Sequence, residues 1–357
     1  SVTKNDAVDE GNTMQVAFEE KSPKDQEIAS ETDEEVLLDG GEKLFNIFKV
    51  GKVSADFSVN GLGRNIDSIA FWEAPNPSNT LMFVTAKSGD LVEVWRYPFL
   101  DNEQTPLRID GIPNGVEVDQ ERSELLIGDA RNNRVIVFSL PSFQFKREFG
   151  GGVIGGGETN LDILHRDGDS FAYVTNSKMV YVFNSATGQK VRTISPPVSE
   201  METVLADDFH QTIYVPEEQG ASGFRSGVYS YNYDGTLNKK NGSNHFGNSG
   251  VFVNDEEGIV LYSCASNGLL DDGSGLIIIS EQSSPVNQFE FFNRQTWKHL
   301  GTLQVEGVKG TDGIAIFQKP LPNFPEGIFA AVDDDSRVAI VDWRKIMKAT
   351  GFSCDGI

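Results

Sequence analysis

The chain has 357 residues, enough for one large domain or two ordinary ones, and its 36 glycines favour strands and turns over helices. Its formal net charge is −23, from 53 acidic residues against 30 lysines and arginines, so its field repels nucleic acids and anionic membranes. No apolar run reaches the length of a membrane span, and we therefore expect a soluble chain without membrane insertion.

The first predicted segment is an N-terminal extension, residues 1–42. It is polar and aperiodic, and it carries 13 acidic residues against 3 lysines, a net charge of −10. Such a segment cannot bury enough apolar surface to fold by itself, so we expect a poorly structured extension. Its charge also makes it a candidate docking segment for a protein partner. The folded domain is then expected over residues 43–357.

From residue 43 onward, short apolar runs alternate with turn signals such as NSATGQ, YDGT and DDGSG. Helical periodicity is nearly absent before VDWRKIMKA, close to the end of the chain. These patterns predict an all-β protein with many short strands.

Six segments repeat one pattern, in which a polar or glycine-rich lead and an acid precede a short apolar strand. The spacings between their acids are 50, 45, 40, 55 and 55 residues, which suits four-stranded propeller blades with loops. The segments are NIDSIAFW with Asp67, NGVEVDQ with Glu117, TNLDILH with Asp162, EMETVLADD with Glu202, NDEEGIVLYS with Glu257 and GTDGIAIFQ with Asp312. We therefore predict a six-bladed β-propeller, with the ring closed by LFNIFKV and GIFAAVD…RVAIVDW.

The repeated acids have a chemical consequence. The first strand of a blade lines the central channel, so an acid at the same place in every blade would lie near one mouth of it. Carboxylates that face a common axis cannot all stay ionised without compensation, which divalent cations would supply. Oxygen ligands without a His or Cys cluster favour Ca²⁺ over Zn²⁺, and the chain has only four histidines.

Several of these segments resemble the β-propeller phytases, calcium-dependent enzymes that remove phosphates from inositol hexakisphosphate. The resemblance runs from about residue 65 to residue 352. It rests on DSIAFWEAPNPSNTLMFVTAKSGDLVEVW, NGVEV, METVLADDFHQTIYVPEEQ, DEEGIVLYS, SEQSSP and TDGIAI. The resemblance implies seven calcium ligands: Asp67, Glu202, Glu218, Asp255, Glu257, Gln282 and Asp312.

The family also clamps phosphate with basic residues, and the resemblance places Lys87, Arg131 and Lys178 in such positions. With Glu202 they form the expected catalytic set, and Arg131 suits a bidentate phosphate contact. The sequence departs from the family at Ser68, and at Glu117 where the family has Asp. Ala86 stands where a site Lys is expected and Asp119 where an Arg is. GETNLDILH holds no clear match to the site Tyr, and the loop before the last blade is shortened to EGVKG.

The resemblance implies a calcium-dependent phosphomonoesterase acting on a small phosphorylated substrate, through a water that the cations activate. Two alternatives stay open: a non-catalytic, calcium-stabilised propeller that serves binding or assembly, and a lactonase or esterase-type propeller. The glycine-rich stretch GGGVIGGGE lacks the Lys-Ser/Thr of a phosphate-binding loop, so we read it as an inter-blade loop.

The three consecutive acids of NDEEGIVLYS are expected to separate by strand alternation. Asp255 and Glu257 would face one cation together, whereas Glu256 would point to the opposite side of the strand. We therefore expect substitution of Glu256 to matter less than substitution of either neighbour.

The two cysteines, Cys264 and Cys354, would be ordinary thiols in a reducing compartment. In an oxidising one they could pair and tie the C-terminal tail to an internal strand. We expect a secreted protein, with the periplasm as the alternative compartment.

Overall fold

The computed structural model describes residues 45, 47–61, 65–100, 106–218, 227–247, 250–264 and 271–354 of the chain. Residues 1–42, for which the sequence predicts a poorly structured extension, lie outside these ranges. Within the described residues, α1 (Trp343–Thr350) is the only α-helix, as VDWRKIMKA predicts. No helix of this part is long and apolar enough to cross a membrane.

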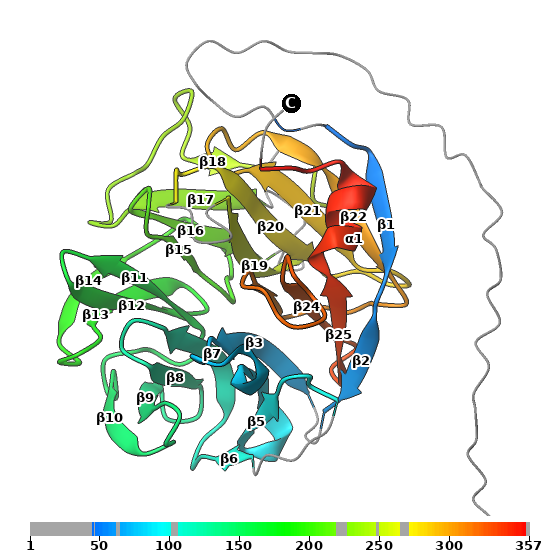
Figure 1. Cartoon of the computed structure of the whole chain (residues 1–357). Coiled ribbons are helices and arrows are strands. Elements are labelled where there is room, and N and C mark those ends of the chain that lie inside the picture. The colour runs from blue at the N-terminus through cyan, green and yellow to red at the C-terminus, as the bar shows by residue number, and fades with distance from the viewer. Residues whose placement is uncertain are drawn as a thin grey trace, which may run out of the picture. The chain divides into compact units, whose positions relative to one another are not determined.

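Six sheets form the blades of a ring, numbered here in chain order (Figure 1). Blade 1 consists of β3 (Ile66–Trp72), β4 (Leu81–Ala86), β5 (Leu91–Arg96) and β6 (Leu107–Arg108). Blade 2 consists of β7 (Pro113–Asp119), β8 (Glu124–Asp129), β9 (Arg134–Ser139) and β10 (Phe145–Phe149). Blade 3 consists of β11 (Leu161–Arg166), β12 (Asp169–Asn176), β13 (Met179–Asn184) and β14 (Lys190–Ile194).

The remaining blades follow the same antiparallel order. Blade 4 consists of β15 (Leu205–Asp207), β16 (Thr212–Glu217), β17 (Gly227–Asn232) and β18 (His245–Phe246). Blade 5 contains β19 (Glu256–Ser263), β20 (Gly275–Glu281), β21 (Gln288–Asn293) and β22 (His299–Glu306), and blade 6 contains β23 (Ile314–Phe317), β24 (Ile328–Asp333) and β25 (Arg337–Asp342).

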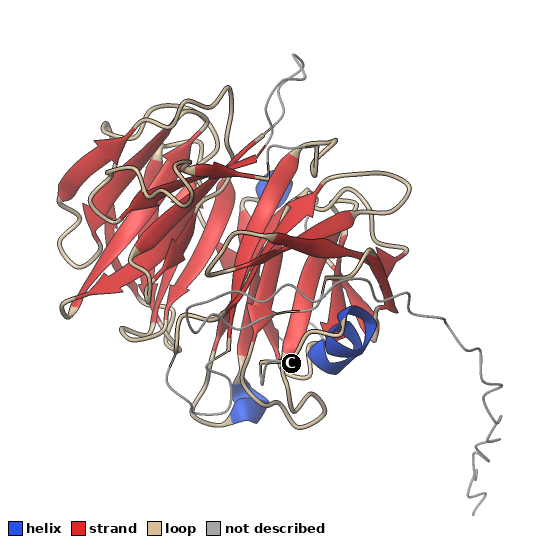
Figure 2. Ribbon diagram, turned by 90° about the horizontal axis from the view of Figure 1, so that it is seen from above, coloured by secondary structure: helices blue, strands red, loops and turns tan. Residues whose placement is uncertain are grey.

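The first strand of each blade is the innermost one. These strands contact one another in succession from β3 to β23, and β23 contacts β3 again, which closes the ring. Together they line the central channel. The structure therefore confirms the predicted six-bladed β-propeller, and Figure 2 shows the sheets around the ring with α1 at its edge.

The ring is closed by the N-terminal part of the chain, though not by the segment that the sequence predicts. The outermost strand of blade 6 is β2 (Phe57–Asn60), which pairs antiparallel with β25. Of the residues of LFNIFKV that the structure describes, only Val50 belongs to a strand, β1 (Val50–Ser54), which pairs parallel with β22 of blade 5. Phe48 of LFNIFKV packs on the core instead, with its ring centroid 5.7 Å from that of Phe291 in blade 5.

The apolar core lies between neighbouring blades. The cluster between blades 6 and 1, for example, combines Ile66 and Val84 with Ile328, Ala330 and Val338. Middle strands are covered by a blade on each face, so β4 is buried at all of its positions. This explains why these strands read as continuous apolar runs rather than alternating ones.

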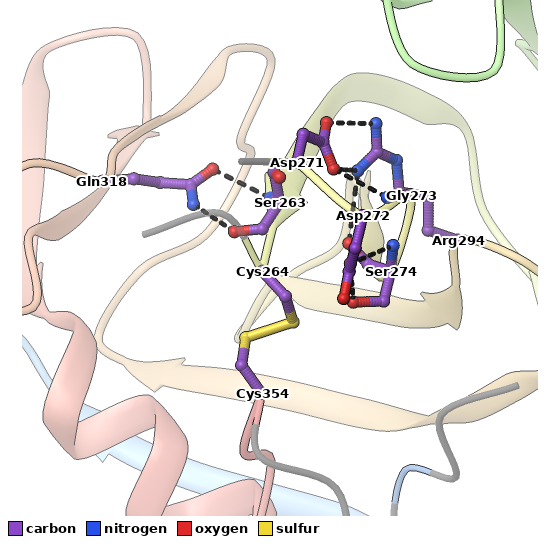
Figure 3. Close-up of a disulfide and its surroundings, with 9 residues drawn as sticks. All are labelled: Ser263, Cys264, Asp271, Asp272, Gly273, Ser274, Arg294, Gln318 and Cys354. Carbon is purple, nitrogen blue, oxygen red and sulfur yellow. Dashed lines mark hydrogen bonds and ion pairs between the residues drawn. A yellow bond between two sulfur atoms is a disulfide. The ribbon is translucent and has the colours of Figure 1, made fainter. Parts of the chain in front are cut away.

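A disulfide joins Cys264, which follows β19, to Cys354 after α1, with Cα atoms 5.3 Å apart (Figure 3). Beside it, Gln318 accepts a hydrogen bond from the Ser263 N–H and donates one to the Ser263 carbonyl. The bridge spans 90 residues of sequence. It ties the C-terminal segment to the end of the innermost strand of blade 5.

Replacing Cys354 by Ser is expected to lower the free energy of unfolding by about 2–5 kcal/mol, because the cross-link no longer restricts the unfolded chain. Urea denaturation under oxidising conditions measures the change. In a reducing buffer the variant and the parent chain should converge, which serves as the control. Equal midpoints under oxidising conditions would contradict the expectation.

Candidate functional site

One face of the ring, called here the channel mouth, is where all innermost strands begin. Because strands within a blade run antiparallel, the turn between its second and third strands returns to this face. The predicted metal ligands lie at strand starts or just after second strands, and the predicted basic residues lie on the turns of blades 1 to 3. The fold therefore gathers both sets at one face.

The strand register shows which acids are equivalent. In blade 1, Asp67 lies in a bulge between the pairs Ile66↔Ala86 and Ile69↔Val84. Glu257 occupies the same place in blade 5, where the bulge lies between Glu256↔Glu281 and Ile259↔Ile279. Glu202 and Asp312 lie at the starts of blades 4 and 6.

The prediction that all six acids share one position is wrong for blades 2 and 3. In the bulge of blade 2, Asn114 occupies the position that Asp67 has in blade 1, and Glu117 follows three residues deeper in the channel. Thr85 Oγ1 donates to the carbonyl of Asn114 as Thr175 Oγ1 donates to that of Glu202, which confirms this equivalence. Asp162 is likewise deeper, inside β11. The sequence pattern takes the acid nearest to each apolar run as the equivalent residue. It does not reveal the bulge, which shifts the equivalent position.

The glycines after the acids have a steric reason. A Cβ on Gly313 would lie 1.9 Å from the carbonyl oxygen of Asp67, and one on Gly258 would lie 2.6 Å from that of Asp312. Neighbouring inner strands approach too closely there for any side chain. The narrow mouth thus imposes the glycines after Glu257 and Asp312 in blades 5 and 6.

Three of the predicted ligands form a compact group. One carboxylate oxygen each of Glu218, Asp255 and Glu257 lies within 4.8 Å of the others. Glu218 follows β16, and Asp255 and Glu257 lie on the same side of the start of β19. Carboxylate oxygens at this spacing fit a hard cation such as Ca²⁺.

A second group surrounds Lys87 on the turn of blade 1. Its Nζ lies 2.5 Å from Asp67 Oδ2 and 3.1 Å from Glu158 Oε2. Asn114 Nδ2 donates to the same two oxygens over 2.7 and 3.2 Å. Burial alone would lower the pKa of Lys87, but Asp67, Glu158 and Glu202 raise it, so the ammonium keeps its charge.

Glu158 was not identified from the sequence. It ends GGGVIGGGE, and the glycines before it give the segment the composition of a plain loop. The available signal was an acid three residues before the apolar run that begins with Leu161 and forms β11. Burial opposes its charge, but the contacts with Glu202 and Lys87 lower its pKa below the ordinary value.

Glu202 connects the two groups. Its carboxyl group lies within hydrogen-bonding reach of those of Glu257 and Glu158. Burial, followed by the hydrogen bond and charge of Glu257, raises its pKa far above the ordinary value. The side chain therefore holds a proton between two other carboxyl groups at neutral pH.

The remaining predicted ligands complete the mouth. Gln282 Nε2 donates to Asp312 Oδ1 over 2.5 Å. Burial and the charges of Asp67 and Glu257 raise the pKa of Asp312 to about 8. Burial and the charge of Glu257 also raise the pKa of Glu218 to about 7. All seven predicted ligands thus lie at the channel mouth.

The other basic residues lie further out. Arg131, on the turn of blade 2, places its guanidinium Nη2 3.1 Å from Asp90 Oδ1, and both side chains are about half exposed. Lys178 is exposed on the corresponding turn of blade 3. Of the three predicted basic residues, Lys87 is the one that contacts a predicted metal ligand, Asp67.

The two departures at Ala86 and Asp119 differ in position. Ala86 ends β4 fully buried in the core between blades 6 and 1. Asp119 ends β7, at the opposite end of the channel from the mouth, and accepts the N–H of Arg122 and contacts His165. An arginine at residue 119 would not reach the mouth, so the expected correspondence there was wrong.

Comparison with known families and structures gives one family match. A family model described as Phytase matches residues 176–353, which hold Lys178 and all of the predicted ligands except Asp67. The chain is also similar to a solved structure described as Kuenenia stuttgartiensis Hydrazine Synthase, at 15% identity and a TM-score of 0.52, over 83% of this chain and 81% of that one. This second likeness concerns the fold alone. No curated protein sequence matches the chain.

In the presence of a chelator, the unfolding temperature is expected to fall as the pH rises from about 4.5 to about 8. The pKa values of Glu218 and Asp312 are raised to about 7 and about 8, so the folded chain holds these protons more tightly than the unfolded chain. Their stabilising contribution is complete below the ordinary values of 4.5 and 3.8 and is lost as the pH rises through the folded ones.

Added Ca²⁺ should offset this loss most strongly at the alkaline end, because cation binding requires deprotonated ligands. Thermal scans at several pH values, with Asp312→Asn as the matched variant, measure the effect. The variant should show a shallower fall. An unfolding temperature that rises over this pH range in chelator would contradict the expectation.

Proposed function

The chain belongs to the β-propeller phytase family, and we propose that it is a calcium-dependent phosphomonoesterase that releases phosphate from inositol hexakisphosphate or related phosphate esters. The observation that carries the proposal is the convergence of Glu218, Asp255 and Glu257 within 4.8 Å, at the same mouth as the charged Lys87. This chemistry needs carboxylates that bind metal ions and a positively charged side chain that contacts the phosphate.

The residues of the mouth suit calcium by their donor atoms. Glu218, Asp255 and Glu257 would hold one ion, and Asp67, Glu202, Gln282 and Asp312 offer oxygens to others. Bound Ca²⁺ would neutralise the carboxylates, attract phosphate oxygens and lower the pKa of a water. The raised pKa values of these acids express the repulsion that such ions would remove.

The protein's own side chains would divide the remaining work. Lys87 would contact a phosphate oxygen as a point charge, already held in place by Asp67. Glu202 would give up its proton when the ions bind and would then act as a carboxylate at the reacting centre, between Glu257 and Glu158. Arg131 and Lys178, on the outer turns, would bind further phosphate groups of a highly phosphorylated substrate.

We also propose that the protein works outside the cytoplasm, either secreted or in the periplasm. The disulfide between Cys264 and Cys354 supports this, since such bonds persist in oxidising compartments. The acidic segment 1–42 is proposed as a docking segment for a protein partner.

One observation favours a second candidate, a calcium-stabilised propeller without catalysis. Ala86 is buried where a site lysine is expected, so the mouth has fewer phosphate contacts than the family pattern. This candidate predicts that loss of cation ligands affects stability and partner binding alone.

The direct test is phosphate release from inositol hexakisphosphate with Ca²⁺ or with chelator. Asp255→Asn is expected to lower kcat/KM by at least about 100-fold, because the cations it helps to hold carry the transition-state charge. Glu306→Gln, on an exposed side chain at the end of β22, is the matched control. No release between about pH 5 and pH 9 in the presence of Ca²⁺ would rule out the enzyme and leave the non-catalytic candidate.

The basic residues are expected to differ in their kinetic effects. Lys87→Met should lower kcat by about 100-fold, because this ammonium lies among the cation ligands. Arg131→Met and Lys178→Met should raise KM several-fold with little change in kcat, since they lie outside the acidic cluster. Lys52→Met, on an exposed position of β1, controls for net charge. A larger kcat effect at residue 131 than at residue 87 would reverse these roles.

A further inference from the structure

Three strands that carry mouth ligands also carry a glutamate directed away from the channel. Glu217 precedes Glu218, Glu256 lies between Asp255 and Glu257, and Glu281 precedes Gln282. Because strand side chains alternate, these neighbours enter the joint between blades 4 and 5. Glu217, Glu256 and Glu281 are 5%, 0% and 1% exposed, so all three are inside the protein. Glu256 thus faces away from the channel, as the sequence predicts.

The three side chains share one region. Glu256 and Glu281 are directly opposite each other in the pairing of β19 with β20. Glu217 ends β16 of blade 4, and β16 contacts β19. Glu256 interacts through charge with both Glu281 and Glu217, which places all three carboxyl groups around the same joint.

Their oxygens are only partly satisfied. Glu217 Oε1 accepts the N–H and the hydroxyl of Ser199. Glu281 Oε1 accepts the N–H groups of Val253 and Asn254 and the side-chain amide of Asn254. Four buried oxygens have no hydrogen-bond partner: Glu217 Oε2, Glu256 Oε1, Glu256 Oε2 and Glu281 Oε2. Among the described residues, no lysine, arginine or histidine forms an ion pair with any of the three.

Equivalent positions in other blades do not show this pattern. The pair Glu256↔Glu281 corresponds to Ile66↔Ala86 in blade 1, which is fully buried and apolar. Where blade 2 has an acid at the end of its second strand, Asp129, the carboxylate is 2.9 Å from Arg134 Nε and accepts several N–H groups. The fold therefore needs no unpartnered glutamates at this place, and each costs free energy when desolvated.

We propose that Glu217, Glu256 and Glu281 form a second, buried site for one Ca²⁺, separate from the channel mouth. The donors are all oxygens, which selects a hard cation. Ca²⁺ tolerates irregular arrangements of carboxylates, whereas Mg²⁺ keeps several waters, for which an enclosed joint of packed strands has little room. The ion would cross-link blades 4 and 5 directly behind Glu218, Asp255 and Gln282 and so fix the backbone of three mouth ligands.

The three side chains must turn to complete the site. In the structure, the carboxylate oxygens of Glu217, Glu256 and Glu281 do not form a group within 4.8 Å of one another. Those of Glu218, Asp255 and Glu257 do. Glu256 can turn without breaking a hydrogen bond, because neither of its oxygens has one, whereas Glu217 and Glu281 can turn only as far as the hydrogen bonds to their Oε1 atoms allow. The fixed oxygens of Glu217 and Glu281 would keep these two side chains anchored meanwhile.

Calcium content tests the site without reference to activity. The full-length protein is dialysed against a weak chelator, and retained calcium is measured by mass spectrometry. Glu256→Leu, which copies the apolar pair of blade 1, is expected to retain one ion fewer per chain than the parent. Glu218→Gln, at the mouth, should not remove this same ion. Equal calcium content in the parent and Glu256→Leu would overturn the proposal.

Two further measurements apply if Glu256→Leu does not fold. Glu281→Gln should show the same loss of one retained ion. Crystals of the parent protein soaked with Tb³⁺ should give an anomalous peak between residues 217, 256 and 281, and an empty joint would overturn the proposal.

The effect of Glu256→Leu on the unfolding temperature should also change sign when calcium is added. In chelator, Glu256→Leu is expected to raise the unfolding temperature, because it removes two unpartnered oxygens; with Ca²⁺ it should lower it. An equal rise under both conditions would mean neutral, cation-free carboxyl groups and would overturn the proposal. Absence of phosphatase activity would leave these outcomes unchanged, so the two proposals fail separately.

Discussion

Repulsion between carboxylates that the ring forces together is the constraint on which the rest of the structure depends. Asp67, Glu202, Glu257 and Asp312 come from four blades, and each begins an inner strand at the same mouth. Lys87 is the cation in contact with this group, and it offsets only part of the charge. The apolar packing between blades must hold the acids together, since their pKa values show that they repel. A cation that bound these acids would therefore stabilise the fold as it bound.

The mouth is also divided by charge. Blades 1 to 3 contribute turns with Lys87, Arg131 and Lys178, whereas blades 4 to 6 contribute most of the carboxylates. Asp67 and Glu158 are the exceptions, and Lys87 contacts both of them. A phosphate ester that lay across such a mouth would meet cations held by protein on one side and basic side chains on the other. The division suits a substrate with more than one phosphate group.

Much of this arrangement could be predicted from the sequence, because a polar lead and an acid recur before the short apolar strand that begins a blade. The period of a strand predicts that Asp255 and Glu257 share one side, and the resemblance to the phytases implies that this side faces the cations. Glu117 and Asp162 were misplaced, since a bulge shifts the register without changing the composition. Glu158 is missed because the glycines before it give the segment the composition of a plain loop. The closing strand is predicted too early in the chain, because Phe45 and Phe48 resemble strand residues, although Phe45 packs on Phe352 after α1 and Phe48 on Phe291 of blade 5.

The pairing of β2 with β25 has a consequence for how the protein is made. The last blade needs a strand from each end of the chain, separated by about 280 residues of sequence. During synthesis, blades 1 to 4 can form while blade 6 is still incomplete. Asp312 then joins Asp67 only when the final strands arrive. The acidic mouth is thus assembled last, so a nascent chain does not have to bear its full repulsion before the ring that contains it exists.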